Sequence, residues 1–231
     1  MRPNLKASKP THGACDDRPV NRHFVIGRAL NGIVARAPAL WPLIRGPMRG
    51  FFDNRAADWE VRTTAGSAAH LAPLAAALLQ VSPEPERALD LGTGLGDGAL
   101  LIAREFPHSR VRGVDISEEM IRRAQERIGL DPEGRVAFKV ADAAELPFED
   151  DSFDLVAQLN MPPFFGEIAR VLRPGGFAVV AASWGPATPF YTPDSVLERG
   201  FRKAGLEKVE AGEAAEGTYF VARRPSNAAH K

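Results

Sequence analysis

Short apolar runs alternate with segments of helical spacing from about residue 67 onward. Continuous apolar runs predict buried strands, and they occur at 87–91, 111–115, 136–140, 153–159 and 177–183. Apolar residues three or four positions apart predict helices between them, at 67–79, 98–106, 117–129, 166–173 and 192–205. Two last segments, 206–211 and 217–223, have the spacing of a hairpin. This alternation predicts an α/β fold with a mostly parallel sheet and helices on both faces.

Several predicted helices have favourable end residues. Ser67 and Ser117 are candidate N-caps, because their hydroxyls can accept a backbone N–H of the first turn. Thr192 is expected to cap another helix, with Pro193 at its first position. The run 174–176, Pro-Gly-Gly, is expected to end a helix before the fifth strand.

The N-terminal region has a different pattern. Large apolar side chains recur at helical spacing at Ile26, Leu30, Ile33, Val34, Ala37, Trp41 and Ile44. Pro38 and Pro42 interrupt this spacing, so we expect two short helices. Few large apolar side chains precede them. The predicted organisation is a disordered basic tail, a helical extension or lid, a main domain and a flexible tail, over 1–23, 24–65, 66–225 and 226–231.

Charge and cysteine content narrow the choice of partners. Residues 1–50 hold nine Lys and Arg against two acidic residues, a net +7 in a chain whose total is zero. A solvated arm or packing on the main domain or a partner subunit is the favoured interpretation, with peripheral membrane contact as an alternative. We expect no nucleic-acid partner. One cysteine, Cys15, no 18-residue apolar run and a polar start predict a cytoplasmic protein without a disulfide, membrane span or secretory signal.

The strongest chemical signal is a glycine loop after the first strand, with the sequence LDLGTGLG at 89–96. Glycine lets the backbone turn tightly and lets a ligand lie against it, and the following helix N-terminus adds free N–H groups. Residues 94–99 also match the dinucleotide fingerprint G-x-G-x-x-A. Asp90 argues against that alternative, because its carboxylate would repel a pyrophosphate and suits a cationic ligand.

Acidic residues also close the next two strands. Asp115 ends the second strand, where a carboxylate can accept hydrogen bonds from a ribose diol. Asp142 follows the third strand and could accept from the exocyclic amine of adenine. Three acids in order at successive strand ends predict a nucleoside-containing ligand with a positive charge.

Four segments together resemble the ordered motifs of class I S-adenosylmethionine (SAM)-dependent methyltransferases: LDLGTGLG (89–96), GVDIS (113–117), ADAAELPFEDDSFDLV (141–156) and EIARVLRPGG (167–176). The resemblance implies a Rossmann-like, seven-stranded sheet whose last strand is antiparallel. It implies that Asp90, Gly92, Thr93, Gly94 and Gly96 surround the methionine moiety. It places Asp115 on the ribose, Ile116 against adenine, and Asp142 with the Ala143 backbone at the adenine edge.

A second resemblance lies upstream of the main domain. The segment 52–60, F-D-x-x-A-x-x-W-E, is similar to one in ubiquinone/menaquinone C-methyltransferases and their relatives. That similarity implies that Trp59 helps to cover the cofactor, although Trp59 and Glu60 replace the usual Tyr and Asp. The fourth strand departs from many relatives, because a short apolar loop follows it. Asn160 in this loop is expected to orient a substrate oxygen or the sulfonium, or to cap the local turn. Met161, Phe164 and Phe165 are candidates for an apolar substrate wall.

The function predicted from these signals is in-line methyl transfer from SAM to a small, partly apolar molecule. No catalytic base is assigned, since His70 and Asp53 are candidates without a motif, and no metal is expected. Two alternatives stay open: a SAM-binding protein without catalysis, and a nicotinamide-dependent oxidoreductase. The acceptor atom and the oligomeric state are also left open.

Overall fold

Seven strands form one sheet in the computed structural model, which describes residues 22–59, 61, 64–129, 131 and 133–226. Their order is β3-β2-β1-β4-β5-β7-β6. The strands are β1 (Arg87–Leu91), β2 (Arg110–Asp115), β3 (Val136–Val140), β4 (Phe153–Leu159), β5 (Leu172–Ala182), β6 (Glu207–Ala214) and β7 (Gly217–Arg223). β7 is antiparallel to both neighbours, and the pairs among β1 to β5 are parallel. The predicted seven-stranded fold with an antiparallel last strand is confirmed.

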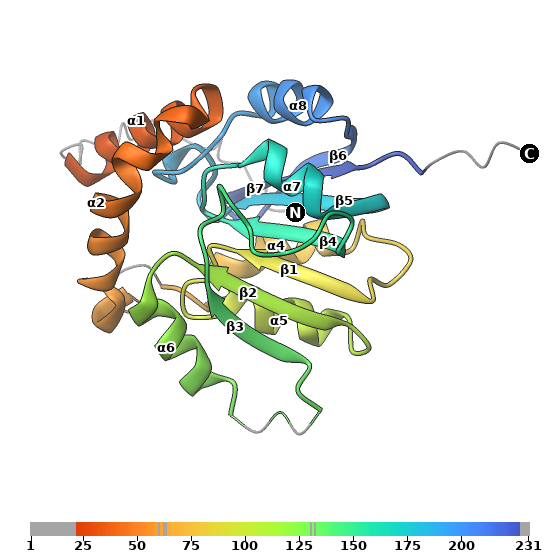
Figure 1. Cartoon of the computed structure of the whole chain (residues 1–231), viewed down its shortest axis with the longest axis horizontal. Helices are drawn as coiled ribbons and strands as arrows, with labels where there is room; N and C mark the ends of the chain where they lie inside the picture. The colour runs from red at the N-terminus through yellow and green to blue at the C-terminus, as the bar shows by residue number, and fades with distance from the viewer. Residues whose placement is uncertain (1–21, 60, 62–63, 130, 132, 227–231) are drawn as a thin grey trace, which may run out of the picture.

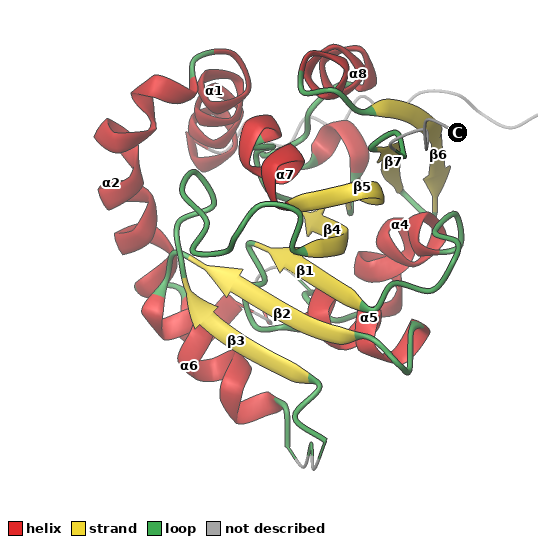
Figure 2. Cartoon of the chain, turned by 45° about the vertical axis from the view of Figure 1, so that its right-hand side comes forward, coloured by secondary structure: helices red, strands yellow, loops and turns green. Residues whose placement is uncertain are grey.

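Helices cover both faces of this sheet (Figures 1 and 2). On one face, α4 (Ala68–Leu78), α5 (Asp97–Glu105) and α6 (Glu118–Arg127) share a core with Val111, Leu155 and Val179. On the other, α7 (Phe165–Val171) and α8 (Asp194–Lys203) pack over a core that includes Val156 and Phe220. Because the strands from β1 to β5 are parallel, their carboxyl ends meet at one edge, and Figure 2 shows the arrowheads there facing α2.

The N-terminal helices lie against that edge. They are α1 (Arg22–Arg36), a 3-10 turn (Pro38–Leu40), α2 (Trp41–Asp53) and a second 3-10 turn (Ala56–Asp58). Two helices were expected, but Pro42 does not interrupt them: it stands in the first turn of α2, where a missing N–H costs nothing. Val34 and Trp41 of the apolar stripe are buried, whereas Ile26 is 53% exposed, so the stripe is not buried along its whole length.

Two of the three predicted caps are confirmed. Ser67 accepts the backbone N–H of His70, and Ser117 accepts that of Met120. The prediction for Thr192 is wrong: α8 begins at Asp194 without a side-chain cap. The buried Thr192 hydroxyl instead accepts the Asn31 amide at 3.0 Å, which fastens α1 to the segment before α8.

The fifth strand begins earlier than expected. We predicted a helix to residue 173 and a strand from 177, but α7 ends at Val171 and β5 begins at Leu172. The run 174–176 does not separate helix from strand, because β5 accommodates it as an irregularity in its pairing with β4. A β-bulge takes up the extra residues of one strand without ending the ladder.

Some predictions fall on residues outside the described part of the chain. These are the properties of residues 1–21, including Cys15, the residue Glu60 and the tail 227–231. Among the described residues, no helix is long and apolar enough to cross a membrane.

Candidate functional site

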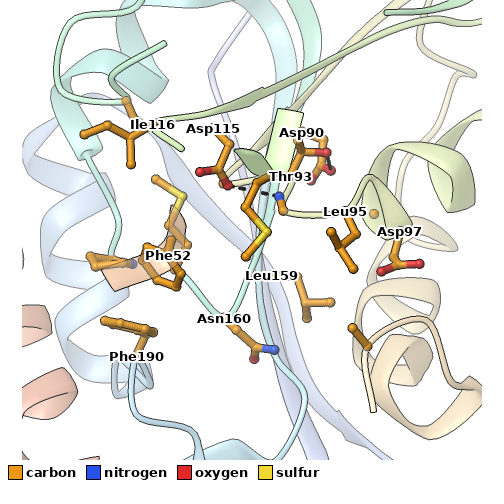
Figure 3. A pocket seen from close by; sticks show the side chains of 18 of the residues that line it. Phe52, Asp90, Thr93, Leu95, Asp97, Asp115, Ile116, Leu159, Asn160 and Phe190 are labelled. Atoms are coloured by element: carbon orange, nitrogen blue, oxygen red, sulfur yellow. Dashed lines mark hydrogen bonds between the residues drawn. The ribbon is translucent and has the colours of Figure 1, made fainter. Parts of the chain in front are cut away.

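A cavity of about 510 Å³ lies at the carboxyl edge of the sheet, beneath α2. Its walls come from α2, the glycine loop after β1, the ends of β2 and β4, and the segment after β5. Figure 3 shows Asp90 and Asp115 on one side of the cavity and Asn160 on another, with Phe52 and Phe190 closing it. Parts of the chain far apart in sequence therefore contribute to a single ligand-sized space.

The glycine loop provides a bare backbone wall. Gly94 has φ +53°, and an added Cβ there would meet no atom within 4 Å, so its open side faces the cavity that it lines. Gly96, with φ +89°, has a different role: a Cβ there would lie 2.6 Å from the ring of Phe138. Gly96 is not among the lining residues, so of the predicted loop contacts Asp90, Gly92, Thr93 and Gly94 reach the cavity.

Asp90 is an acid held beneath the loop. It is 2% exposed and accepts the hydroxyl of Thr93 at 2.6 Å and the backbone N–H of Ala99 in α5. Burial raises the pKa of Asp90 to about 7, against the opposing effect of these hydrogen bonds. A cationic ligand in the cavity would favour the ionised form.

Asp115 presents the carboxylate best placed for a ribose. One of its oxygens accepts the N–H of Gly94 at 3.0 Å and the other accepts that of Ser117 at 2.9 Å (Figure 3 shows the former as a dashed line). The backbone N–H of Ile116 also bonds to this carboxylate, and because a carboxylate offers about four lone-pair positions, acceptor capacity remains for a ligand. Burial raises the pKa of Asp115. Ile116, the next residue, lines the cavity with its apolar side chain.

Asp142 lies differently from the sequence-based expectation. Its carboxylate oxygens accept the indole N–H of Trp41 at 2.8 and 2.9 Å, and one of them also accepts the backbone N–H of Ala144. Asp142 is absent from the cavity lining, whereas Ala143 belongs to it. The carboxylate that we expected on adenine is therefore bound to the inner face of α2.

The segment after β4 forms the floor beside the loop. Asn160 has φ +57°, and its amide exchanges two hydrogen bonds with Ser183, donating to the hydroxyl at 2.9 Å and accepting the backbone N–H at 2.8 Å. This favours its role in the local turn, although the residue also lines the cavity. Met161 and Phe164 belong to the expected apolar wall, but Phe165 does not: its ring packs on Phe201 instead.

Some residues of the upstream motif, 52–60, line the cavity, and others hold neighbouring elements together. Trp59 lines the cavity and makes an edge contact with Phe52, their ring centres 5.4 Å apart. Asp53 points elsewhere: it accepts the Ser117 hydroxyl at 2.5 Å and the backbone N–H of Glu119 at the start of α6. These contacts do not support Asp53 as a catalytic base, because its carboxylate is bound at the start of α6 and the residue is absent from the cavity lining.

Sequence reasoning missed one whole wall. Trp184, Thr188, Pro189 and Phe190 follow β5 and line the cavity. Phe190 approaches Phe52, with 6.4 Å between ring centres, and so brings this segment against α2. The concentration of aromatic residues and prolines between 184 and 193 was the available signal, but nothing in it indicates which side of the sheet the segment covers.

Known proteins resemble this chain over its central part. Residues 88–176 match the family model described as a methyltransferase domain. The chain is 39% identical over 106 residues to the ubiquinone/menaquinone biosynthesis C-methyltransferase of Geobacter sulfurreducens, covering 42% of this chain and 41% of the relative. It is 39% identical over 137 residues to the 27-O-demethylrifamycin SV methyltransferase of Amycolatopsis mediterranei, covering 55% and 47%. The chain thus spans less than half the length of these relatives.

Solved structures share the fold at lower identity. A SAM-dependent methyltransferase from Aquifex aeolicus superposes with a TM-score of 0.59 at 19% identity, covering 68% of this chain and 93% of that one. The [4+2]-cyclase SpnF superposes with a TM-score of 0.56 at 22% identity, covering 69% and 82%. These likenesses concern the fold alone.

Proposed function

We propose that residues 88–176, which match the model of a methyltransferase domain, belong to a class I methyltransferase domain, and that the protein binds SAM in the cavity beneath α2 and transfers its methyl group to a small molecule. The observation that carries the proposal is the pairing of an open glycine backbone at Gly94 with the remaining acceptor capacity of the Asp115 carboxylate. The ribose diol of a nucleoside fits that pair.

The proposed cofactor site uses the residues predicted from sequence, with three exceptions: Gly96, Asp142, and Asn160, whose amide is bound to Ser183. Asp115 binds the ribose, Ile116 and the Ala143 backbone flank adenine, and Trp59 covers the site from above. The loop residues Gly92, Thr93 and Gly94 receive the methionine moiety, with Asp90 supplying negative charge beneath it. Gly96 acts through packing on Phe138, and Asp142 acts through Trp41, so neither contacts the ligand in this proposal.

The remaining part of the cavity is suited to an apolar, uncharged acceptor. Its side chains beyond the loop are mainly apolar, among them Met48, Phe164, Pro189 and Phe190. No Lys or Arg occurs in the lining of the described chain, so a negatively charged acceptor would lose hydration without gaining an opposite charge. We propose a small apolar molecule as the substrate, held in line with the methyl group while α2 excludes water.

The finer proposal is contact with an anionic membrane surface through α2 and the turn before it. Leu43 of α2 is 75% exposed and Leu40 of the turn is 45% exposed, and α2 carries Arg45 and Arg49 without an acid before Asp53. Exposed leucines on a helix that also carries arginines are typical of interfacial helices. The protein should sediment with phosphatidylglycerol vesicles and not with phosphatidylcholine vesicles, and Leu43→Glu should weaken sedimentation. Equal recovery of the protein with both kinds of vesicle, or no recovery with either kind at low salt, rejects this contact.

We also propose a cytoplasmic location, which the low cysteine content favours.

A SAM-binding protein without methyl transfer is the competing function, since the [4+2]-cyclase SpnF has the same fold. Incubation with methyl-tritiated SAM and a panel of apolar phenols, enols and amines separates the two. Transfer of label to at least one acceptor supports the enzyme. Tight SAM binding without labelling of any acceptor favours the non-catalytic alternative.

A further inference from the structure

His70 is a buried histidine in the first turn of α4, and the residue is part of the cavity lining. It is 8% exposed, and its Nδ1 is buried without a hydrogen-bond partner among the described residues. A buried polar atom without a partner destabilises the folded state. Such an atom in a ligand cavity is explained if a bound molecule makes use of the ring.

The other ionisable side chains in the described cavity lining are Asp90, Asp97 and Asp115. Each has a polar partner already: Asp90 accepts the Thr93 hydroxyl, Asp97 pairs with Arg127 at 2.8 Å, and Asp115 accepts three backbone N–H groups. Within this lining, His70 is thus the ionisable group whose side chain is not committed to the protein.

The position of His70 is fixed from the acceptor side of the cavity. Its backbone carbonyl accepts the Ser183 hydroxyl at 2.8 Å, and Ser183 is held in turn by Asn160. Ser183 and Asn160 follow β5 and β4, which lie on the opposite side of β1 from β2 and Asp115. The backbone of His70 is therefore held on the side of the cavity away from the proposed ribose contact.

Burial also keeps the imidazole neutral. It lowers the pKa of His70 below 6.5, while the charge of Asp97 in α5 opposes this shift without cancelling it. Asp90 and Asp115 line the same cavity but do not contribute to the shift. At pH 7 the ring therefore has a free lone pair that can take a proton.

We propose that His70 is the catalytic proton acceptor and that the substrate is an apolar molecule with a phenol or enol hydroxyl; this deepens, and rests on, the proposed methyl transfer. The nucleophilic atom of the acceptor forms a bond to the methyl carbon as the bond from that carbon to sulfur breaks, and sulfur keeps the electron pair. The hydroxyl proton of the acceptor passes to the imidazole, which returns it to water after the product leaves. A general base of this kind is needed because the nucleophile starts with a proton.

The test uses the full chain saturated with S-adenosylhomocysteine, and 2-naphthol as the acceptor probe. Ring ¹⁵N resonances of histidine report contact, and calorimetry reports both affinities. His70→Phe removes the base and keeps a ring, and His108→Ala removes an exposed histidine as the matched control. Since replacing an unpaired buried polar group with an apolar one is nearly neutral, His70→Phe should melt no lower than the parent protein.

We expect 2-naphthol to shift the His70 resonances and to bind at least fivefold more weakly to His70→Phe, while the affinity for S-adenosylhomocysteine changes less than twofold. The affinity of the parent protein for 2-naphthol should also decline as the imidazole becomes protonated below pH 6.5. His70→Phe should show a smaller decline, because only the titration of Asp90 remains in that variant. His108→Ala should behave as the parent.

Two results would overturn the proposal. If S-adenosylhomocysteine alone shifts the His70 resonances and His70→Phe loses tenfold in affinity for it, His70 holds the cofactor. If 2-naphthol leaves the parent resonances unchanged, the ring has no contact with the acceptor; this measurement stands even if His70→Phe does not fold. Failure of the parent to bind S-adenosylhomocysteine would instead reject the proposed function, so the two failures are distinguishable.

Discussion

Removal of the Asp115 carboxylate tests how the cavity binds a nucleoside. Besides its bonds to the backbone N–H groups of Gly94, Ile116 and Ser117, the carboxylate keeps acceptor capacity for the hydroxyls of a ribose diol. Hydrogen bonds to a charged group contribute about 1.5–3 kcal/mol each. Even a fraction of two such bonds exceeds the 1.4 kcal/mol that corresponds to about tenfold in affinity. Asp115→Ala should therefore bind S-adenosylhomocysteine at least about tenfold more weakly.

The same substitution also frees the Gly94 and Ser117 N–H groups, so a loosened loop could weaken binding by itself. A cycle with two ligands separates these effects: S-adenosylhomocysteine and its 2′,3′-dideoxy analogue are titrated by calorimetry into the parent and into Asp115→Ala. A loosened loop weakens the binding of both ligands by the same factor, so its effect cancels in the cycle. The effect of the diol contact does not cancel.

Removal of the diol from the ligand should lower its affinity for the parent protein at least about tenfold, and its affinity for Asp115→Ala less than about threefold. An equal loss in both proteins would refute the assignment, because the diol would then be bound elsewhere. A Ser109→Ala variant, altered in a buried hydroxyl bonded to Pro85 away from the cavity lining, should show the same diol dependence as the parent.

Two further predictions concern groups around the same cavity. Because the pKa of Asp90 is raised to about 7 in the free protein, its proton stabilises the folded state in acid, and that contribution is lost as the pH rises from about 4 through 7. Binding of cationic SAM should release this proton, so the affinity for SAM should rise between pH 5.5 and 7 and calorimetry should detect proton release. Asp90→Asn should abolish both the rise in affinity and the proton release. Buffer-independent binding heats across that range would contradict this linkage. Trp41→Phe keeps the buried ring but removes the donor to Asp142, so α2 should dock about 1–2 kcal/mol less tightly and its amides should exchange hydrogen about 5–30 times faster. Arg45→Ala, which removes only a 3.5 Å exposed contact to Asp142, is the control, and unchanged exchange in Trp41→Phe would show that the indole bond does not hold α2.

Features set by local sequence were predictable, and those set by distant partners were not. The strand at 87–91, the glycine loop and the Ser67 and Ser117 caps depend on residues within a few positions of one another. Thr192 also has the local signature of a cap, but its hydroxyl is taken by Asn31, 161 positions away. Local capping preference is weaker than a buried tertiary hydrogen bond, so the sequence pattern gave the wrong partner.

The candidate site follows the same division. Asp115 lies where the strand pattern predicts, because the carboxyl ends of parallel strands meet at one edge of the sheet regardless of loop conformation. Asp142 lies at the expected strand end, yet its carboxylate binds Trp41, which comes from a helix 101 positions earlier. The docking of α2 decides that contact, and no spacing in the sequence reveals it. The wall at 184–190 was missed for the same reason.

Calorimetric titration of the full chain with SAM and, separately, with NADH is the most direct test of the central claim that the cavity beneath α2 is a SAM site. We predict saturable binding of SAM at one molecule per chain, a raised melting temperature in its presence, and no heat of binding for NADH. Folded protein that binds neither SAM nor S-adenosylhomocysteine at about 1 mM, a concentration that detects binding free energies as weak as about −4 kcal/mol, or that binds NADH in their place, would contradict the claim.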